Sequence, residues 1–239
     1  MIFNPTIASV TLRAALGRRR ALLYAIPPLI LIGVSAILRL TSPADPAWPA
    51  RILGEFGFSV VLPLTALIIG TSVLGAEVDD GSVVHLLATP VPRRVIITTK
   101  FAVATAVTAV FAALPELLAG LIAAGPRLAV GLFAGALAAA VIYNALFVCL
   151  STATSRALVA GLAYVVIWEG AAANVVGGAR ILSVSHYGLA VASSVAPGHA
   201  LQPGVGLITA CVLGAVATAG ALAAAVHRLG SFSLRGETA

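Results

Sequence analysis

Charged residues are scarce in this chain of 239 amino acids, at 9% of the sequence against 60% hydrophobic residues. Soluble globular domains carry roughly 25% charged residues, so the composition excludes a chain whose surface faces water throughout. Lysine occurs once, at Lys100, between Thr99 and Phe101. A phosphate-binding loop needs Gly-x-x-x-x-Gly-Lys followed by Ser or Thr. We therefore expect that this chain does not bind ATP.

Other motifs of site chemistry are missing as well. The sequence contains no Cys-x-x-Cys, His-Glu-x-x-His or Gly-x-Ser-x-Gly motif, which argues against metal and nucleophile sites. The two cysteines, Cys149 and Cys211, lie in apolar runs and are expected to be packing residues. Ser183, Ser185 and His186 cluster in one segment, where turn and cap chemistry is the simpler interpretation. We expect no catalytic residue, no metal site and no cofactor in this chain.

Long apolar runs take the place of these motifs. Each is near the length needed to cross about 30 Å of hydrocarbon as a helix, and lipid offers no partner to an unpaired backbone group. The runs predict one all-α integral membrane domain over 1–239 with six transmembrane helices, at about 21–40, 55–75, 101–124, 128–150, 157–178 and 204–226. The spacing of Gly131 and Gly135 permits close helix contact, but it is common in a chain so rich in Ala and Gly and identifies no partner.

The net charge of +6 is spread between the apolar runs, which favours contact with lipid over nucleic acid. We expect the chain to lie in the cell membrane, inner or plasma, with both termini in the cytoplasm. This orientation places ten basic residues inside and four outside. The inside set is Arg13, Arg18, Arg19, Arg20, Arg93, Arg94, Lys100, Arg156, Arg228 and Arg235, and the outside set is Arg39, Arg51, Arg127 and Arg180. A seventh span over 181–197 would reduce this bias to eight against six, so we expect 179–203 to be re-entrant.

The first residues predict a helix on the membrane surface. Asn4 can cap its start and Pro5 suits its first turn. Ile7, Val10 and Ala14 then give residues 5–19 an apolar face that suits an interfacial helix. The alternative is a disordered basic leader.

The segment 76–99 joins spans two and three on the cytoplasmic side. It begins as an acidic turn, continues as a short helix with an apolar face, and stops at two prolines. The apolar positions are Val83, Val84, Leu86 and Leu87. Such a helix suits docking into a groove of a soluble partner. The alternative is a connecting loop that packs on its own bundle.

This segment resembles the first cytoplasmic loop of type-2 ABC transporter permeases. The matching positions are Glu77, Gly81-Ser82, Leu86-Leu87, Pro90, Arg93-Arg94 and Lys100, and the Asp79-Asp80 pair is more acidic than the family pattern. The resemblance implies a permease dimer, of two copies or of close homologues, joined to two ATPase subunits that carry ATP and Mg. It also implies a coupling helix, with an ATPase interface formed by Glu77, Asp79, Asp80, Gly81, Val83, His85, Leu86, Leu87 and Pro90.

Polar residues inside the spans are candidates for a substrate path, because ionisable groups are costly in lipid. They are Glu116, Glu169, Asn144 and Asn174. Pro115, next to Glu116, is expected to distort the third span. The alternative is that the two glutamates are protonated or hydrogen-bonded between helices and only fix packing.

Together these features predict a membrane-spanning permease subunit of an ATP-driven ABC exporter that has no enzymatic activity of its own. The alternative is an ATP-independent secondary transporter or a structural membrane scaffold subunit. Secondary transporters often contain two similar halves, and no internal repeat is visible in this sequence.

Overall fold

The computed structural model describes residues 3–41, 48–79, 91–173, 178–198 and 201–235, and all regular structure in these ranges is helical. This confirms the predicted all-α class. The elements are α1 (Pro5–Ala15), α2 (Arg18–Thr41), η1 (Ala50–Val61), α3 (Leu62–Asp79), α5 (Arg93–Thr108), η2 (Ala109–Ala113), α6 (Leu114–Ala124), α7 (Pro126–Ala153), α8 (Ala157–Ala163), η3 (Tyr164–Ala172), η4 (Ala179–Leu182), α10 (Val184–Val195) and α11 (Leu207–Arg235).

The surface helix begins as the sequence predicts. The Asn4 side chain accepts hydrogen bonds from the backbone N–H groups of Thr6 and Ile7, at 3.0 and 3.3 Å, and so caps α1. The helix ends at Ala15 rather than at residue 19. Gly17, a poor helix former, separates α1 from α2, which starts at the next residue.

Within the described ranges, five helices are long and apolar enough to cross a membrane, at Ala21–Thr41, Ile52–Leu74, Arg93–Ala124, Pro126–Ala153 and Leu207–Gly230. The fifth predicted span corresponds to a shorter apolar helix, Ala157–Ala171. The third helix starts eight residues before its apolar run. The carbonyl of Pro92 accepts from the N–H groups of Val95 and Ile96, so the basic segment 93–100 forms the first two turns.

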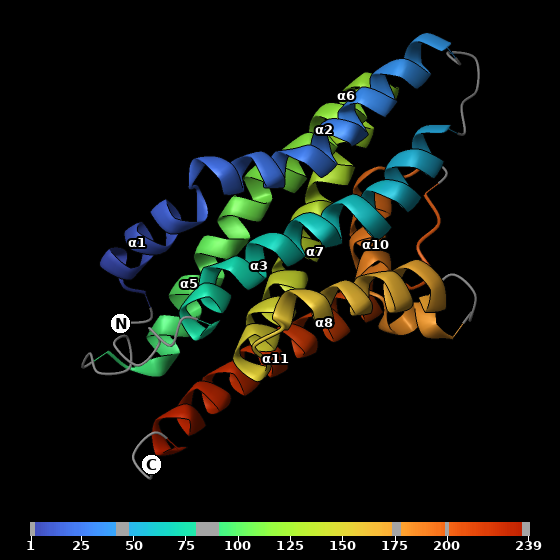
Figure 1. The fold of residues 1–239 in the computed structure, drawn as a ribbon. Coiled ribbons are helices and arrows are strands. Elements are labelled where there is room, and N and C mark those ends of the chain that lie inside the picture. The colour runs from blue at the N-terminus through green and yellow to red at the C-terminus, as the bar shows by residue number, and fades with distance from the viewer. Residues whose placement is uncertain (1–2, 42–47, 80–90, 174–177, 199–200, 236–239) are drawn as a thin grey trace.

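The helix α7 lies at the centre of the bundle and packs against α3, α6, α10 and α11. Both chain termini lie at one end of the bundle, together with the end of α3 and the start of α5 (Figure 1). We call this the terminus end. The end of α2, the start of η1 and the helix α10 lie toward the opposite end, which we call the far end (Figure 1).

The segment predicted to be re-entrant, 179–203, contains α10, a helix of 12 residues, which is shorter than the ~20 residues needed to cross a bilayer. It packs on the side of α7 that carries Gly131 and Gly135. A Cβ atom at Gly131 would lie 2.7 Å from the Cβ of Ala196 and 2.8 Å from the carbonyl of Ala192. On another side, a Cβ at Gly188 would lie 2.8 Å from the ring of Phe58. The glycine spacing in α7 is therefore the contact surface for α10.

Two spans change from π-helical to α-helical geometry at a Leu-Pro pair. The stretch η1 runs up to Leu62-Pro63, and η2 runs up to Leu114-Pro115. The N–H of Leu62 bonds the carbonyl of Gly57, and the N–H of Leu114 bonds that of Ala109, five residues back. A proline ring crowds the carbonyl four residues before it, and a wider turn relieves this contact. The distortion expected at Pro115 is thus a π stretch.

Candidate functional site

The predicted coupling loop joins α3 to α5 at the terminus end. Of its interface residues, Glu77 and Asp79 belong to the last turn of α3. The others, Asp80, Gly81, Val83, His85, Leu86, Leu87 and Pro90, lie outside the described residues. The predictions made for these side chains therefore stay predictions.

The base of this loop is held by two neighbouring residues of α5. The Nζ of Lys100, which is buried, donates a hydrogen bond of 2.6 Å to the carbonyl of Val73 in α3. The hydroxyl of Thr99 accepts a hydrogen bond of 3.1 Å from the backbone N–H of Asn4, at the start of α1. The only lysine of the chain therefore joins the two helices that flank the loop, and its neighbour ties the surface helix to them.

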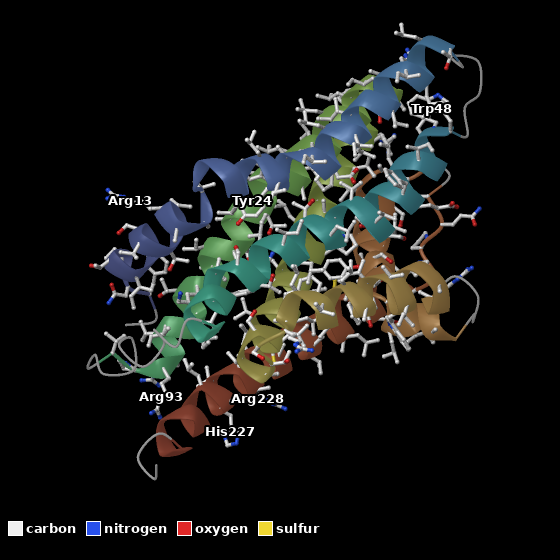
Figure 2. All side chains as sticks on the ribbon, in the orientation of Figure 1. Arg13, Tyr24, Trp48, Arg93, His227 and Arg228 are labelled. Atoms are coloured by element: carbon white, nitrogen blue, oxygen red, sulfur yellow. The ribbon has the colours of Figure 1, made fainter. Side chains whose placement is uncertain are left out.

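Basic side chains gather at the terminus end. Figure 2 shows Arg13 on α1, Arg93 on α5, and His227 and Arg228 on α11 at this end, whereas Trp48 lies at the far end. Arg93 approaches α11 closely, because a Cβ atom at Gly230 would lie 3.7 Å from its Nη1. Cationic groups are favoured near helix C-termini and beside anionic lipid. The terminus end is thus built to carry positive charge.

The buried carboxylate of Glu169 is saturated with hydrogen bonds. Oε1 accepts from the hydroxyl of Tyr164 at 3.1 Å and from the backbone N–H of Val184 at 2.9 Å. Oε2 accepts from the hydroxyls of Ser183 and Ser185, at 2.5 and 2.8 Å, and from the N–H of Ser185 at 3.4 Å. The first N–H groups of a helix have no partner within it. Glu169, from η3, supplies the acceptor for the first two N–H groups of α10.

Further contacts fix the chain around this carboxylate. The indole N–H of Trp168 donates to the carbonyl of Leu182 at 3.2 Å, and the hydroxyl of Tyr187 donates to that of Ile181 at 2.5 Å. The Nδ1 of His186 accepts from the backbone N–H of Gly204 at 3.1 Å. Burial of its ring, and secondarily the charge of Arg180, lowers the pKa of His186, while Glu169 opposes this change. The neutral imidazole of His186 therefore fixes Gly204, in the segment that leads to α11.

Glu116, in the first turn of α6, has the opposite surroundings. Its side chain is 1% exposed, and neither carboxyl oxygen has a hydrogen-bond partner. The carboxyl group lies directly against the backbone of Gly57 in η1, where a Cβ atom would collide with Oε1 and lie 3.2 Å from Oε2. Only a glycine leaves room for the carboxyl at this position.

The two asparagine candidates differ in what the structure says of them. Asn144 is buried in α7, and its Nδ2 donates to the hydroxyl of Thr108 at 3.0 Å and to the carbonyl of Ala140 at 2.8 Å. Its Oδ1 faces Gly70 of α3, where a Cβ would lie 3.1 Å away. Asn144 therefore joins three spans. Asn174 lies outside the described residues.

Residues 7–181 match the family model described as ABC-2 family transporter protein, whereas no curated protein matches the chain. The chain belongs to this ABC-2 family. The match runs from α1 to η4, so it includes the coupling loop, Glu116 and Glu169, and it confirms the resemblance found in the sequence. This ABC-2 protein is a multi-pass membrane permease subunit of an ABC transporter, and permeases of its family generally work with an ATPase subunit.

Proposed function

We propose that this permease is the membrane half of an ATP-driven exporter. Two copies, or one copy and a close homologue, join two copies of a separate ABC ATPase that binds ATP and Mg. ATP binding draws the ATPases together, and the loop 76–99 passes this movement to α3 and α5. The observation that carries the proposal is the family match over 7–181. Two hydrogen bonds support it: that of Lys100 joins α3 to α5, the helices at the two ends of this loop, and that of Thr99 joins α5 to the start of α1.

The proposed orientation places the terminus end, and with it both termini and the loop 76–99, in the cytoplasm of the cell membrane. The basic side chains at that end support it, because positively charged residues favour the cytoplasmic side. Single cysteines at Ser9 and Gln202, both exposed, test it in a background without Cys149 and Cys211. A membrane-impermeant thiol reagent outside intact cells should label position 202 and spare position 9. The reverse pattern would refute this orientation.

The substrate path is proposed to pass the polar residues of the spans, at Glu116, Asn144, Glu169 and Asn174. Of the three that the structure describes, Glu169 and Asn144 already have protein partners. Of these three side chains, only that of Glu116 has polar atoms without a hydrogen-bond partner. The geometry therefore supports Glu116 as the group of this set that is available to a ligand.

Co-expression with a separate ABC ATPase tests the proposal. We expect a complex of two permeases and two ATPases that hydrolyses ATP, whereas the purified permease alone does not. Leu86→Asp should prevent ATPase association, because it places a charge on the docking face, whereas Leu86→Met keeps that face apolar and serves as the matched control. Failure of the ATPase to associate with the wild type, or transport without ATP, would favour a secondary transporter or a scaffold subunit.

A further inference from the structure

The carboxyl group of Glu116 is an unusual feature of the described spans, because it is buried without any hydrogen bond. Buried polar groups in proteins nearly always have a partner, and each exception calls for an explanation. Its oxygens lie against the backbone of Gly57. The carbonyl of that glycine already accepts the N–H of Leu62, and a carbonyl offers no proton to a carboxylate.

Nor do the described side chains of the neighbouring elements supply an opposite charge. The helix α6 packs against α2, η1, η2 and α7. Among the described side chains of these elements, Arg39, Glu55 and Arg127 are exposed. The hydroxyl of Tyr24 pairs with Ser72. The carboxyl of Glu116 contacts none of these groups through a hydrogen bond.

The charge state follows from this environment. An ionised carboxylate without a partner in an apolar interior is so costly that the group takes up a proton instead. We propose that Glu116 is a proton-binding site of the bundle: in this closed arrangement of α6 against η1 the carboxylate holds one proton and is a neutral carboxylic acid. Glu169 differs from it, because its oxygens accept five hydrogen bonds.

The backbone around the site suggests how the proton leaves. Gly57 belongs to the π stretch η1, and the π stretch η2 ends two residues before Pro115. Such stretches often mark functional positions in helices. Separation of α6 from η1 would admit water to Glu116, and water accepts the proton as the carboxylate forms. This inference does not depend on the ATPase, because the ligand is a proton and the site lies within one chain.

Infrared spectroscopy of the full chain in lipid bilayers at neutral pH tests the proposal. The difference spectrum of wild type minus Glu116→Gln should contain the C=O stretch of a protonated carboxylic acid, and this band should shift in D2O. In the matched control, wild type minus Glu169→Gln, the acid band assigned to Glu116 should cancel, because both proteins keep that residue. Carboxylate stretches in the Glu116 difference spectrum would overturn the proposal.

A second variant keeps the test decisive if Glu116→Gln does not fold. The added methyl group of Gly57→Ala would touch the carboxyl of Glu116. The acid band should therefore change its frequency in Gly57→Ala and keep it in Gly33→Ala, where an added Cβ meets nothing within 4 Å. An unchanged band in Gly57→Ala, or no acid band in the wild type, would contradict the assignment to Glu116.

Discussion

Glu116 and Glu169 are both buried acids in membrane helices, but their surroundings differ in every respect that matters for chemistry. Glu169 faces the start of α10, where hydroxyl and backbone N–H groups converge on it. Glu116 faces a glycine and has no hydrogen-bond partner. Burial alone therefore does not decide the role of an acid in a span. The number of donors that reach it separates an acid that anchors a neighbouring helix from one whose oxygens have no hydrogen-bond partner.

The comparison also separates two kinds of cost. Loss of Glu169 would leave several donors without an acceptor, and each such buried group costs free energy. Loss of Glu116 would leave no partner behind, because there is none. The same substitution should therefore have very different effects at the two positions.

The largest expected effect is that of Glu169→Met. A buried donor left without its acceptor costs about 1–3 kcal/mol, and here several donors, among them the first two N–H groups of α10, would lose their acceptor together. We expect a large fall in the melting temperature of the purified protein, measured by size-exclusion chromatography after heating. Glu169→Gln keeps one acceptor oxygen and should lie between Glu169→Met and the wild type. A wild-type melting temperature for Glu169→Met would mean that Glu169 does not anchor α10.

The next effect concerns the contact between Gly57 and the carboxyl of Glu116. In Gly57→Ala the new methyl group collides with the carboxyl, and overpacking of this kind costs about 1–3 kcal/mol. The same melting assay should show an intermediate loss of stability, which the second substitution Glu116→Ala restores by making room. Gly33→Ala, which fills open space, is the control. If Glu116→Ala gave no rescue, the two residues would not be in contact.

A smaller effect is expected near Glu169, where His186 should make the melting temperature depend on pH. The pKa of His186 is lowered mainly by burial, so the folded protein favours the neutral ring. The stability that this residue contributes is complete above its unfolded pKa of about 6.5 and is lost as the pH falls below that value. His186→Gln should flatten the fall in melting temperature between neutral and mildly acidic pH. An equal slope in both proteins would exclude His186 as its source.

The smallest expected effect is that of Glu116→Met, the counterpart of Glu169→Met. An apolar side chain of similar size replaces a group that has no hydrogen bond, which is nearly neutral or stabilising. We expect a melting temperature equal to or above that of the wild type. A loss as large as that of Glu169→Met would show that Glu116 has a partner that matters for folding.

The sequence predicted the features that depend on local pattern. Apolar runs of the required length gave the spans, and Asn4-Pro5 gave the start of α1, because a cap needs only its own next residues. The third span was predicted to start at residue 101, eight residues after the helix begins at Arg93. A search for apolar residues does not see basic side chains that complete the end of a membrane helix, although Pro92 marks that boundary.

Contacts between distant segments were beyond the sequence. The pair Ser183 and Ser185 suggested cap chemistry, but the cap of α10 comes from Glu169, fourteen residues before Ser183, after the chain has reversed. Likewise, the glycine spacing in α7 did not identify α10 as its partner. Whether Glu116 has a hydrogen-bond partner depends on which side chains the neighbouring helices place beside it. The local sequence around Glu116 does not contain that information.

The π stretches before Leu62-Pro63 and Leu114-Pro115 also bear on how this permease tolerates changes in length. A π turn holds more residues than an α turn. A single-residue deletion within η2 can therefore be absorbed locally, and the side chains of the helix on either side keep their orientation toward their neighbours. The same deletion within α7 would turn the rest of that helix by about 100° and carry its glycines away from α10. Spans two and three therefore contain a place where one residue can be lost, whereas the central helix does not.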